Sequence, residues 1–181
     1  METTTSLFTH RLATHRDIPA LSALMDAAIR QLLPAYLPPE AVAASFAVMG
    51  LDSQLIEDRT YFVIEHERSI VGCGGWSRRA TLYGGDGAQG RDAALLDPER
   101  DAARIRAMYT HPDWTRRGIG RLILRLCEAA AGKAGFKRCA LAATLAGAPL
   151  YRACGYVEVA RLHSPTPSGV AVPLIHMEKS L

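Results

Sequence analysis

The sequence has few cysteines, little net charge and no long apolar run, and each shortage excludes a class of protein. Its four cysteines are far apart and form no Cys-x-x-Cys pair, which argues against a disulfide framework or a zinc site and predicts reduced thiols. No stretch of about 18 apolar residues runs uninterrupted, as a membrane span requires. The beginning METTTSLFTH lacks the basic and apolar regions of a secretory signal. We therefore expect a cytoplasmic protein without a bound metal.

The net charge of +3 on 181 residues is also small, and the arginines are spread from Arg11 to Arg161 instead of forming one run. This argues against a nucleic-acid-binding protein and leaves that class as a distant alternative. Hydrophobic residues make up 49% of the chain and charged residues 22%, close to the averages of globular proteins. A chain of this length folds most simply as a single domain, residues 1–181.

Hydrophobic periodicity, prolines and glycines predict a mixed α/β fold with the element order βααβββαβαββ. We expect strands over residues 7–13, 60–67, 69–78, 103–110, 136–143, 156–162 and 170–178. Helices are expected over residues 17–32, 40–50, 119–132 and 148–155. The segment 83–101 is rich in glycine and charge, so we expect a flexible surface loop there. Gly72, Gly74 and Gly75 indicate a bulge in the second strand of the hairpin.

Strand 103–110, ARIRAMYT, is expected to alternate between the two faces of a sheet. Regular alternation places Ile105, Ala107 and Tyr109 on one face. The other face then carries Arg104, Arg106 and Met108.

The stretch HPDWTRRGIGRLIL, residues 111–124, follows this strand and leads into the predicted helix 119–132. A turn at a helix start directs unpaired backbone N–H groups and the positive end of the helix dipole at one place, which attracts phosphate. Gly118 and Gly120 lack Cβ atoms and allow close approach, while Arg116, Arg117 and Arg121 add positive charge. The turn is thus predicted to bind a phosphate or pyrophosphate.

Two common phosphate loops do not match. A Walker loop requires G-x-x-x-x-G-K-[ST], which is absent, and a dinucleotide fingerprint requires a third glycine where Ile123 stands. A simpler interpretation of Gly-x-Gly is a helix start beside solvated arginines, because so short a motif often matches by chance.

The segments RAMYTHPDWTRRGIGRLILRLCEAA and PLYRACGY together resemble the acyl-CoA-binding motifs of the GCN5-related N-acetyltransferases (GNAT). The element order also resembles that fold over nearly the whole chain. The resemblance implies a mainly antiparallel twisted sheet of six to seven strands with about four helices on its faces. It implies acetyl-CoA as cosubstrate and no metal.

The resemblance also implies which residues contact the cofactor. Backbone groups of the strand would contact the thioester and pantetheine, the turn would bind the pyrophosphate, and a hydroxyl before the short late helix would contact a pantetheine amide. These residues are Met108, Tyr109, Thr110, Arg116, Arg117, Gly118, Ile119, Gly120, Arg121 and Thr144. Thr115 departs from the family, which has Arg or Gln there, although its hydroxyl is able to cap the helix. Thr144 stands where the family often has Asn, and Gly147 where Ala is usual.

For catalysis, the resemblance implies that Tyr151 protonates the departing thiolate. A phenol of pKa about 10 is able to protonate a thiolate whose conjugate acid has a pKa near about 8.5 when both are held out of water. Ordinary packing is the simpler interpretation of Tyr151. An amine acceptor must also lose a proton, and Glu65, His111 or a water molecule are candidates for the base, although a lone His or Glu is more often structural.

If Arg78, Arg104 and Arg106 line the open side of the sheet, they suit an acceptor that carries carboxylate or phosphate. A solvated strand face is the simpler interpretation. We expect residues 32–47 to form the wall that selects the acceptor.

The sequence thus predicts an enzyme that transfers the acetyl group of acetyl-CoA to a primary amine of a small molecule or peptide, by direct attack in a ternary complex. The alternative is a CoA-binding sensor or interaction module without turnover. The acceptor is not identified by the sequence, and both a monomer and a homodimer are compatible with it.

Overall fold

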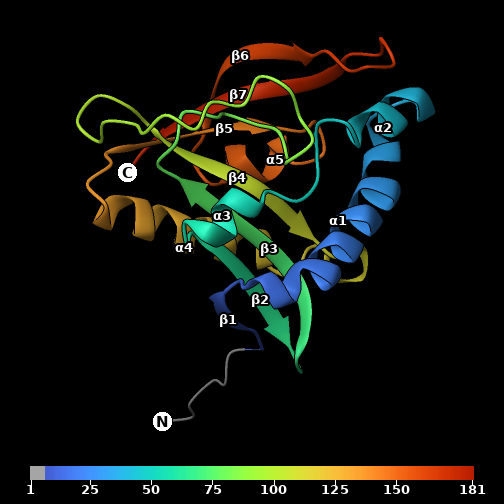
Figure 1. Cartoon of the computed structure of the whole chain (residues 1–181). Coiled ribbons are helices and arrows are strands. Elements are labelled where there is room, and N and C mark those ends of the chain that lie inside the picture. Colours follow the sequence, from blue (N-terminus) through green and yellow to red (C-terminus); the bar gives the residue numbers. More distant parts are fainter. Residues whose placement is uncertain (1–6) are drawn as a thin grey trace.

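A computed structural model describes residues 7–181 as one twisted seven-stranded sheet with helices on both faces (Figure 1). The strands are β1 (Thr9–Leu12), β2 (Tyr61–His66), β3 (Ser69–Ser77), β4 (Ala103–Thr110), β5 (Arg138–Ala143), β6 (Val157–Ser164) and β7 (Val172–Ser180). Their order in the sheet is β1-β2-β3-β4-β5-β7-β6. All neighbours are antiparallel except β4 and β5, which are parallel.

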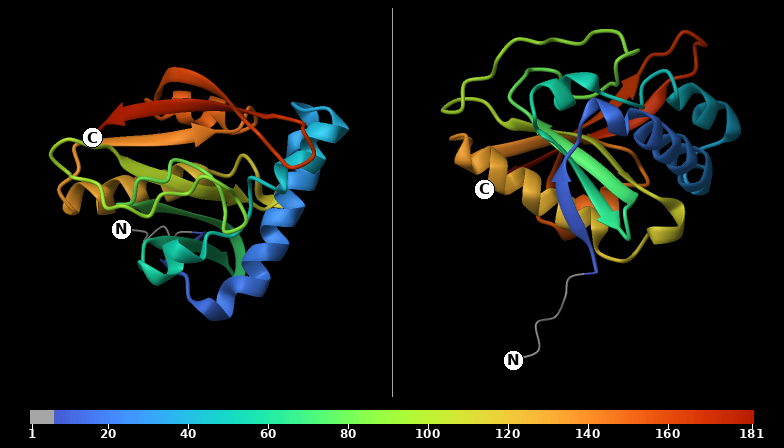
Figure 2. Two further views of the ribbon diagram at one scale, coloured as in Figure 1. Left: turned by 45° about the horizontal axis from the view of Figure 1, so that its top comes forward. Right: turned by 60° about the horizontal axis from the view of Figure 1, so that its bottom comes forward.

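Within residues 7–181 the α-helices are α1 (Ile18–Leu32), α2 (Pro39–Ser45), α3 (Ser53–Glu57), α4 (Ile119–Lys133) and α5 (Ala148–Ala153). α1 crosses one face of the sheet and α4 lies on the opposite face (Figure 2). α3 joins the apolar cluster under α1, and α5 packs with α4. The predicted fold class is confirmed. The structure has one more helix than expected, since α3 is too short to give a periodic signal in the sequence.

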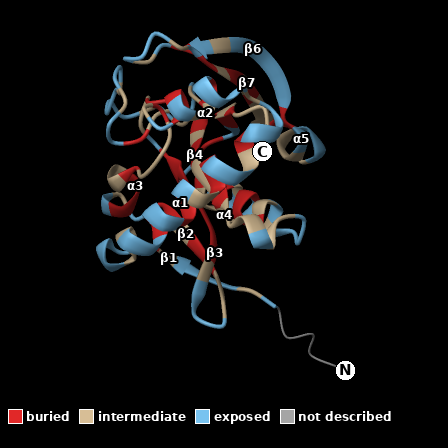
Figure 3. Ribbon diagram, turned by 90° about the vertical axis from the view of Figure 1, so that its right-hand side faces the viewer, coloured by how far each residue is buried: buried red, intermediate tan, exposed pale blue. Residues whose placement is uncertain are grey.

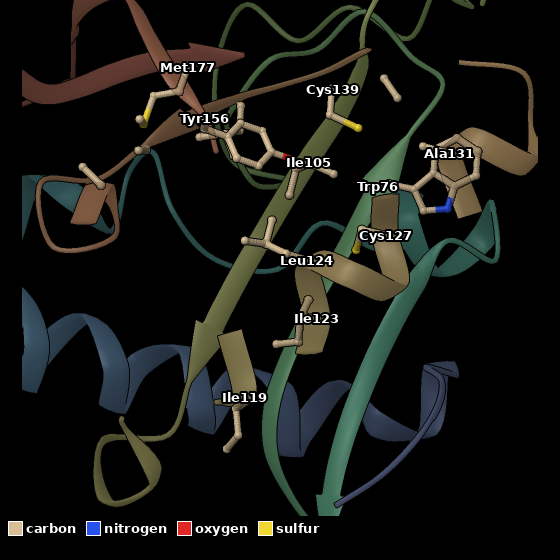
Figure 4. Close-up of a cluster of buried hydrophobic side chains, with 14 of the residues drawn as sticks. Trp76, Ile105, Ile119, Ile123, Leu124, Cys127, Ala131, Cys139, Tyr156 and Met177 are labelled. Carbon is tan, nitrogen blue, oxygen red and sulfur yellow. The ribbon is translucent and has the colours of Figure 1, made fainter. Parts of the chain in front are cut away.

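The apolar stripes of the two long helices explain these layers. α4 buries Ile119, Ile123, Leu124, Cys127 and Ala131, and these side chains meet Trp76, Ile105, Cys139, Tyr156 and Met177 of the sheet region (Figure 4). α1 buries Leu21, Leu24, Met25, Ala28 and Ile29 on the other face. Figure 3 shows the result, with β2, β3 and β4 largely buried and the edge strand β6 largely exposed.

Several predicted boundaries are corrected by the structure. The second helix ends at Ser45 instead of Gly50, and β7 extends from Val172 to Ser180 instead of ending at Glu178.

The hairpin between β2 and β3 turns at Glu67 and Arg68, whose φ angles are 47° and 72° respectively. Positive φ at both central residues is typical of a type I′ hairpin turn.

The glycines of β3 allow close packing on both faces. A Cβ on Gly72 would overlap the Ile119 side chain, and one on Gly74 would lie 2.6 Å from that of Ile123. A Cβ on Gly75 would lie 2.8 Å from the Tyr61 ring, on the opposite face. The predicted irregularity in β3 is present next to Gly72. Ile64 pairs with Gly72 and Glu65 with Ile70, which leaves Val71 as the extra residue of β3.

A second irregularity lies in β4 and corrects the expected alternation. Cys73 pairs with Tyr109 and Gly75 with Arg106, so two residues of β4, Ala107 and Met108, face Gly74 alone. This is a β-bulge, and an extra residue shifts the side chains beyond it to the other face. Ile105 and Met108 therefore pack on the α4 side, while Ala107 and Tyr109 pack on the α1 side.

The remaining expectations concern the thiols and the loop 83–101. All four cysteines are free, and Cys73, Cys127 and Cys139 are buried. No helix within residues 7–181 is long and apolar enough to cross a membrane. Residues 84–92 contact the rest of the fold, since Gly85 N donates to Val48 O and Asp86 N donates to Leu51 O. The expected flexibility of the segment 83–101 stays a prediction.

Candidate active site

A pocket of about 130 Å³ lies where β4 and β5 diverge. The two strands pair at Ala103 with Cys139 and at Arg104 with Ala140. Among residues 7–181, the later residues of β4 have no pairing partner on that side. The pocket is lined by residues of the two strands, by Leu174 of β7, by Thr144, Gly147 and Tyr151, and by two further segments, residues 48–50 with Asp52 and residues 82–85.

The backbone of β4 supplies polar groups to this gap. His111 N donates to Val71 O of β3 at 2.9 Å, and residues along an antiparallel strand point their backbone groups alternately to the two sides. By that alternation, Thr110 and Met108 direct N–H and C=O away from β3, toward the gap beside β5. Met108 and Tyr109 line the pocket, and Thr110 follows them at the end of β4.

The turn after β4 carries a group of backbone N–H donors. Leu122 N donates to Gly118 O in the first helical hydrogen bond of α4, and within residues 7–181 we find no acceptor for the backbone N–H groups of residues 116–121. Arg116 and Gly118 have positive φ angles of 63° and 83°. The first N–H groups of a helix and its positive dipole end together attract an anion. The geometry therefore fits the predicted phosphate site.

The two glycines of the turn have different roles. Gly118 needs a positive φ angle, and a Cβ there would meet nothing within 4 Å. A Cβ on Gly120 would lie 2.6 Å from the Leu150 side chain of α5. Gly120 thus allows α5, which carries Tyr151, to pack against the start of α4.

We expect Gly118→Ala to destabilise the fold by about 1 kcal/mol, because alanine is strained at positive φ whereas glycine is not. The melting temperature should fall by about 2–4 °C for a chain of this size, and the Kd for CoA should rise as the turn distorts. Gly87→Ala is the matched control, since Gly87 also has open space around its Cβ position but no positive φ. Thermal melting and calorimetric titration measure the two effects. If Gly118→Ala and Gly87→Ala have equal effects, Gly118 has no special role in the turn.

The arginines of the turn lie at its rim. Arg116, Arg117 and Arg121 are all exposed, and the guanidinium of Arg117 lies over the Trp114 ring at 4.5 Å from its centroid. Thr115 does not cap α4 as expected, because its hydroxyl donates to Pro112 O at 3.2 Å. Its short side chain stabilises the preceding turn instead.

Tyr151 lies on α5 at the pocket, and its ring packs edge-to-face on Tyr156 with centroids 6.0 Å apart. We find no hydrogen bond to its hydroxyl from any residue that the structure describes. Burial raises the pKa of Tyr151 above its ordinary value, and the nearby Tyr109 adds to the rise. The phenol therefore keeps its proton at neutral pH, as a general acid requires.

Thr144 also lines the pocket, but its hydroxyl oxygen already accepts a hydrogen bond from Gly147 N at 3.1 Å. The hydroxyl proton remains available for a ligand. A Cβ on Gly147 would lie 3.0 Å from the Tyr151 ring, so the smaller residue leaves room for that ring.

The two side-chain candidates for the base do not line the pocket. Glu65 accepts two hydrogen bonds from Arg11, at 2.8 and 3.1 Å, on the β1 edge of the sheet. His111 starts the turn at residues 112–114, where its Nδ1 accepts a hydrogen bond from Asp113 N at 3.2 Å. The structure gives both residues hydrogen-bond partners away from the pocket.

The three arginines expected to bind an anionic acceptor are not brought together. Arg78 lies over the Trp76 ring at 5.4 Å, and Arg104 donates to the backbone oxygens of Ala80 and Ala102. Of the three, Arg106 alone lines the pocket. Neither Arg78 nor Arg104 is placed to contact a ligand there.

Arg106 is neutralised by Asp52. Its Nη2 lies 2.8 Å from Asp52 Oδ2, and the guanidinium also donates to the backbone oxygens of Thr81 and Gly84. Arg106 is 5% exposed and Asp52 is 1% exposed. Arg91 also donates to Asp52, at 2.8 Å. Burial lowers the pKa of Arg106, and Asp52 opposes that shift.

Sequence reasoning missed Asp52 and the two segments around it. The expected acceptor wall, residues 32–47, does not line the pocket, whereas residues 48–50, Asp52 and residues 82–85 do. Asp52 directly precedes α3 and has the sequence signature of a helix cap, yet its side chain makes no cap hydrogen bond. Its arginine partners lie 39 and 54 residues away, and no short motif records such contacts.

The family model for the acetyltransferase (GNAT) domain matches residues 57–158, more than half of the chain. The chain belongs to the GNAT family. The matched region of this GNAT domain includes β4, the turn 111–118, α4 and α5, and so covers the splayed strands and the predicted phosphate site. No curated protein sequence matches the chain.

Solved structures agree with this assignment in their fold. A GCN5-related N-acetyltransferase from Rhodopseudomonas palustris is 22% identical, with 97% of each chain covered and a TM-score of 0.71. The PaiA N-acetyltransferase from Thermoplasma acidophilum, solved with coenzyme A, is 12% identical over 96% of this chain and 99% of its own, with a TM-score of 0.64. A ribosomal-protein-alanine N-acetyltransferase from Brucella melitensis is 20% identical over 96% of this chain and 99% of its own, with a TM-score of 0.64. At such identities the likeness concerns the fold.

Proposed function

We propose that the protein is an acetyl-CoA-dependent N-acetyltransferase that transfers the acetyl group to a primary amine of a small molecule or peptide. One observation carries the proposal. Strand β4, whose later residues pair with no residue of β5, leads from the pocket that Tyr151 lines to the turn where residues 116–121 have backbone N–H groups without an acceptor among residues 7–181. A structural neighbour solved with coenzyme A supports the choice of cosubstrate.

Bound acetyl-CoA supplies an activated thioester to the pocket. The N–H groups of residues 116–121 bind its pyrophosphate, with Arg116, Arg117 and Arg121 at the rim. Met108 and Thr110 bind the pantetheine and acyl portion through their backbone groups. The Thr144 hydroxyl donates to a pantetheine amide, and Tyr151 donates its proton to the sulfur as the thiolate departs.

We propose direct attack by the amine. Burial raises the pKa of the Cys73 and Cys139 thiols to about 12, and no cysteine within the described residues lines the pocket. Neither thiol is thus suited to form an acyl intermediate. With Glu65 and His111 bound elsewhere, we assign the removal of the amine proton to water.

The acceptor side of the pocket favours an amine whose molecule carries no further charged group. Its lining there combines apolar side chains and glycines with one ion pair, Asp52 with Arg106. Because each charge already has its partner, the pocket offers no free cation for a carboxylate or phosphate. This replaces the anionic acceptor that the sequence suggested.

The free cysteines suit the cytoplasm, and we place the protein there. We also propose that it forms one domain over residues 1–181.

The decisive experiment measures thiol release from acetyl-CoA with a panel of amines, alongside melting curves. We expect acetyl-CoA to raise the melting temperature by native-state binding and uncharged arylalkyl or alkyl amines to be acetylated faster than amino acids or amino-sugar phosphates. Stabilisation by acetyl-CoA without release by any amine would identify a CoA sensor instead. Absence of both effects at millimolar acetyl-CoA would contradict CoA binding itself.

A further inference from the structure

The side chain of Tyr61 reaches across one strand of the sheet to the active-site strand. Tyr61 pairs with Gly75 of β3, and Gly75 in turn pairs with Arg106 of β4. A Cβ on Gly75 would lie 2.8 Å from the Tyr61 ring, so the absence of a side chain at this position gives the ring its space. Tyr61 is 0% exposed, and its hydroxyl donates to the backbone oxygen of Ala107 at 2.8 Å.

The hydrogen bond ends at a strained residue. Ala107 has a φ angle of 49°, a left-handed conformation that costs a non-glycine residue about 1 kcal/mol or more. Such a conformation persists only where its surroundings stabilise it. The Tyr61 hydroxyl supplies that support, because it satisfies the backbone oxygen in the bulged conformation. Burial raises the pKa of Tyr61 well above its ordinary value, so the hydroxyl remains a donor.

The bulge determines how the next residue presents its backbone. Ala107 and Met108 together face Gly74, and without the extra residue the alternation along β4 would be shifted by one position. In the bulged strand the Met108 side chain packs toward α4 and its backbone groups point toward the gap beside β5. The C=O of Ala107 and the N–H of Met108 belong to one planar trans peptide group and point in opposite directions. The hydrogen bond from Tyr61 to Ala107 O therefore also fixes the direction of the Met108 N–H.

We propose that Tyr61 is a positioning residue for acyl transfer. Its hydroxyl fixes the bulge at Ala107 and thereby directs the Met108 N–H toward the carbonyl oxygen of the thioester, where negative charge develops during attack by the amine. This rests on the proposed function. Loss of a preorganised donor affects the transition state more than the bound ground state.

The test is a double-mutant cycle between Tyr61→Phe and Ala107→Gly. Tyr61→Phe keeps the ring and removes the hydroxyl, and we expect kcat to fall about tenfold, with KM for acetyl-CoA changed by less than about twofold. Glycine adopts positive φ without strain, so Ala107→Gly should need less support from Tyr61. We expect the loss of kcat from Tyr61→Phe to shrink to about threefold or less when it is measured against Ala107→Gly.

Tyr156→Phe is the matched control, because it also removes one buried tyrosine hydroxyl, for which no hydrogen-bond partner is found within residues 7–181. It should leave kcat unchanged. A purely structural role for Tyr61 would lower stability and leave kcat of the folded fraction intact, and this result would overturn the proposal. Equal losses of kcat in the wild-type and Ala107→Gly backgrounds would also overturn it. If Tyr61→Phe alone lacks a cooperative melting transition, kcat of the double variant Tyr61→Phe/Ala107→Gly is compared with kcat of Ala107→Gly. A tenfold lower kcat in the double variant would overturn the proposal.

Wild-type turnover in the same assay separates this inference from the proposed function. If the wild type releases no thiol with any amine, the proposed function fails. If the wild type is active and Tyr61→Phe retains its full kcat, the positioning role fails and the function stands.

Discussion

Replacing Tyr151 with phenylalanine is expected to lower kcat by about a hundredfold, the lower end of the range for loss of a general acid. The affinity for CoA should change little, because the ring that packs on Tyr156 remains. The reason lies in the chemistry of the leaving group, since without the phenol the thiolate must depart unprotonated or take its proton from water. Steady-state kinetics with a fixed amine and a CoA titration measure the two effects.

The pH dependence gives an independent check on Tyr151. Because burial raises the pKa of Tyr151 above its ordinary value near 10, the acid form persists to higher pH. Wild-type kcat should therefore show no fall from phenol ionisation up to about pH 9.5. Tyr156→Phe serves again as the control for loss of a buried hydroxyl. Retention of more than half of kcat in Tyr151→Phe would reject the acid assignment and leave Tyr151 as packing.

Sequence reasoning predicted well the helices and strands whose residue spacing is periodic within the element itself. α4 follows the spacing of Ile119, Ile123 and Leu126, and the strand 103–110 was predicted with the bounds that the structure has. The turn between them was predicted as an anion site because glycines and a helix start are local signals. The unpaired N–H groups of residues 116–121 are consistent with that prediction.

The features that sequence reasoning missed depend on contacts between distant segments. Nothing in ARIRAMYT signals a bulge, because Ala107 is stabilised by Tyr61, 46 residues away. For the same reason the faces of β4 were assigned wrongly, and Arg106 was taken for an open cation although Asp52 lies beside it. Buried ion pairs and bulges are consequences of tertiary packing, and alternation alone does not encode them.

Asp52 provides the second large effect, on stability. Asp52→Asn removes the carboxylate that faces Arg106 and Arg91 while keeping the shape of the side chain. Arg106 is then a buried cation without a counter-ion, and breaking a buried pair in this way costs about 3–5 kcal/mol. We expect the melting temperature to fall by about 6–20 °C, as measured by calorimetry.

The matched control is Asp58→Asn, at an ion pair of similar geometry but greater exposure, with Arg79 Nε 2.7 Å from Asp58 Oδ2 and the Arg79 side chain 27% exposed. Because water remains available to Arg79, this change should cost about 1 kcal/mol or less. The double variant Asp52→Asn/Arg106→Met should recover part of the lost stability, since it removes the orphaned charge as well as its partner. If Asp52→Asn melts within about 2 °C of the wild type, less than the shift that 1 kcal/mol produces, the ion pair does not stabilise the fold. In that case the backbone oxygens of Thr81 and Gly84, which accept from the Arg106 guanidinium, are sufficient to stabilise the buried charge.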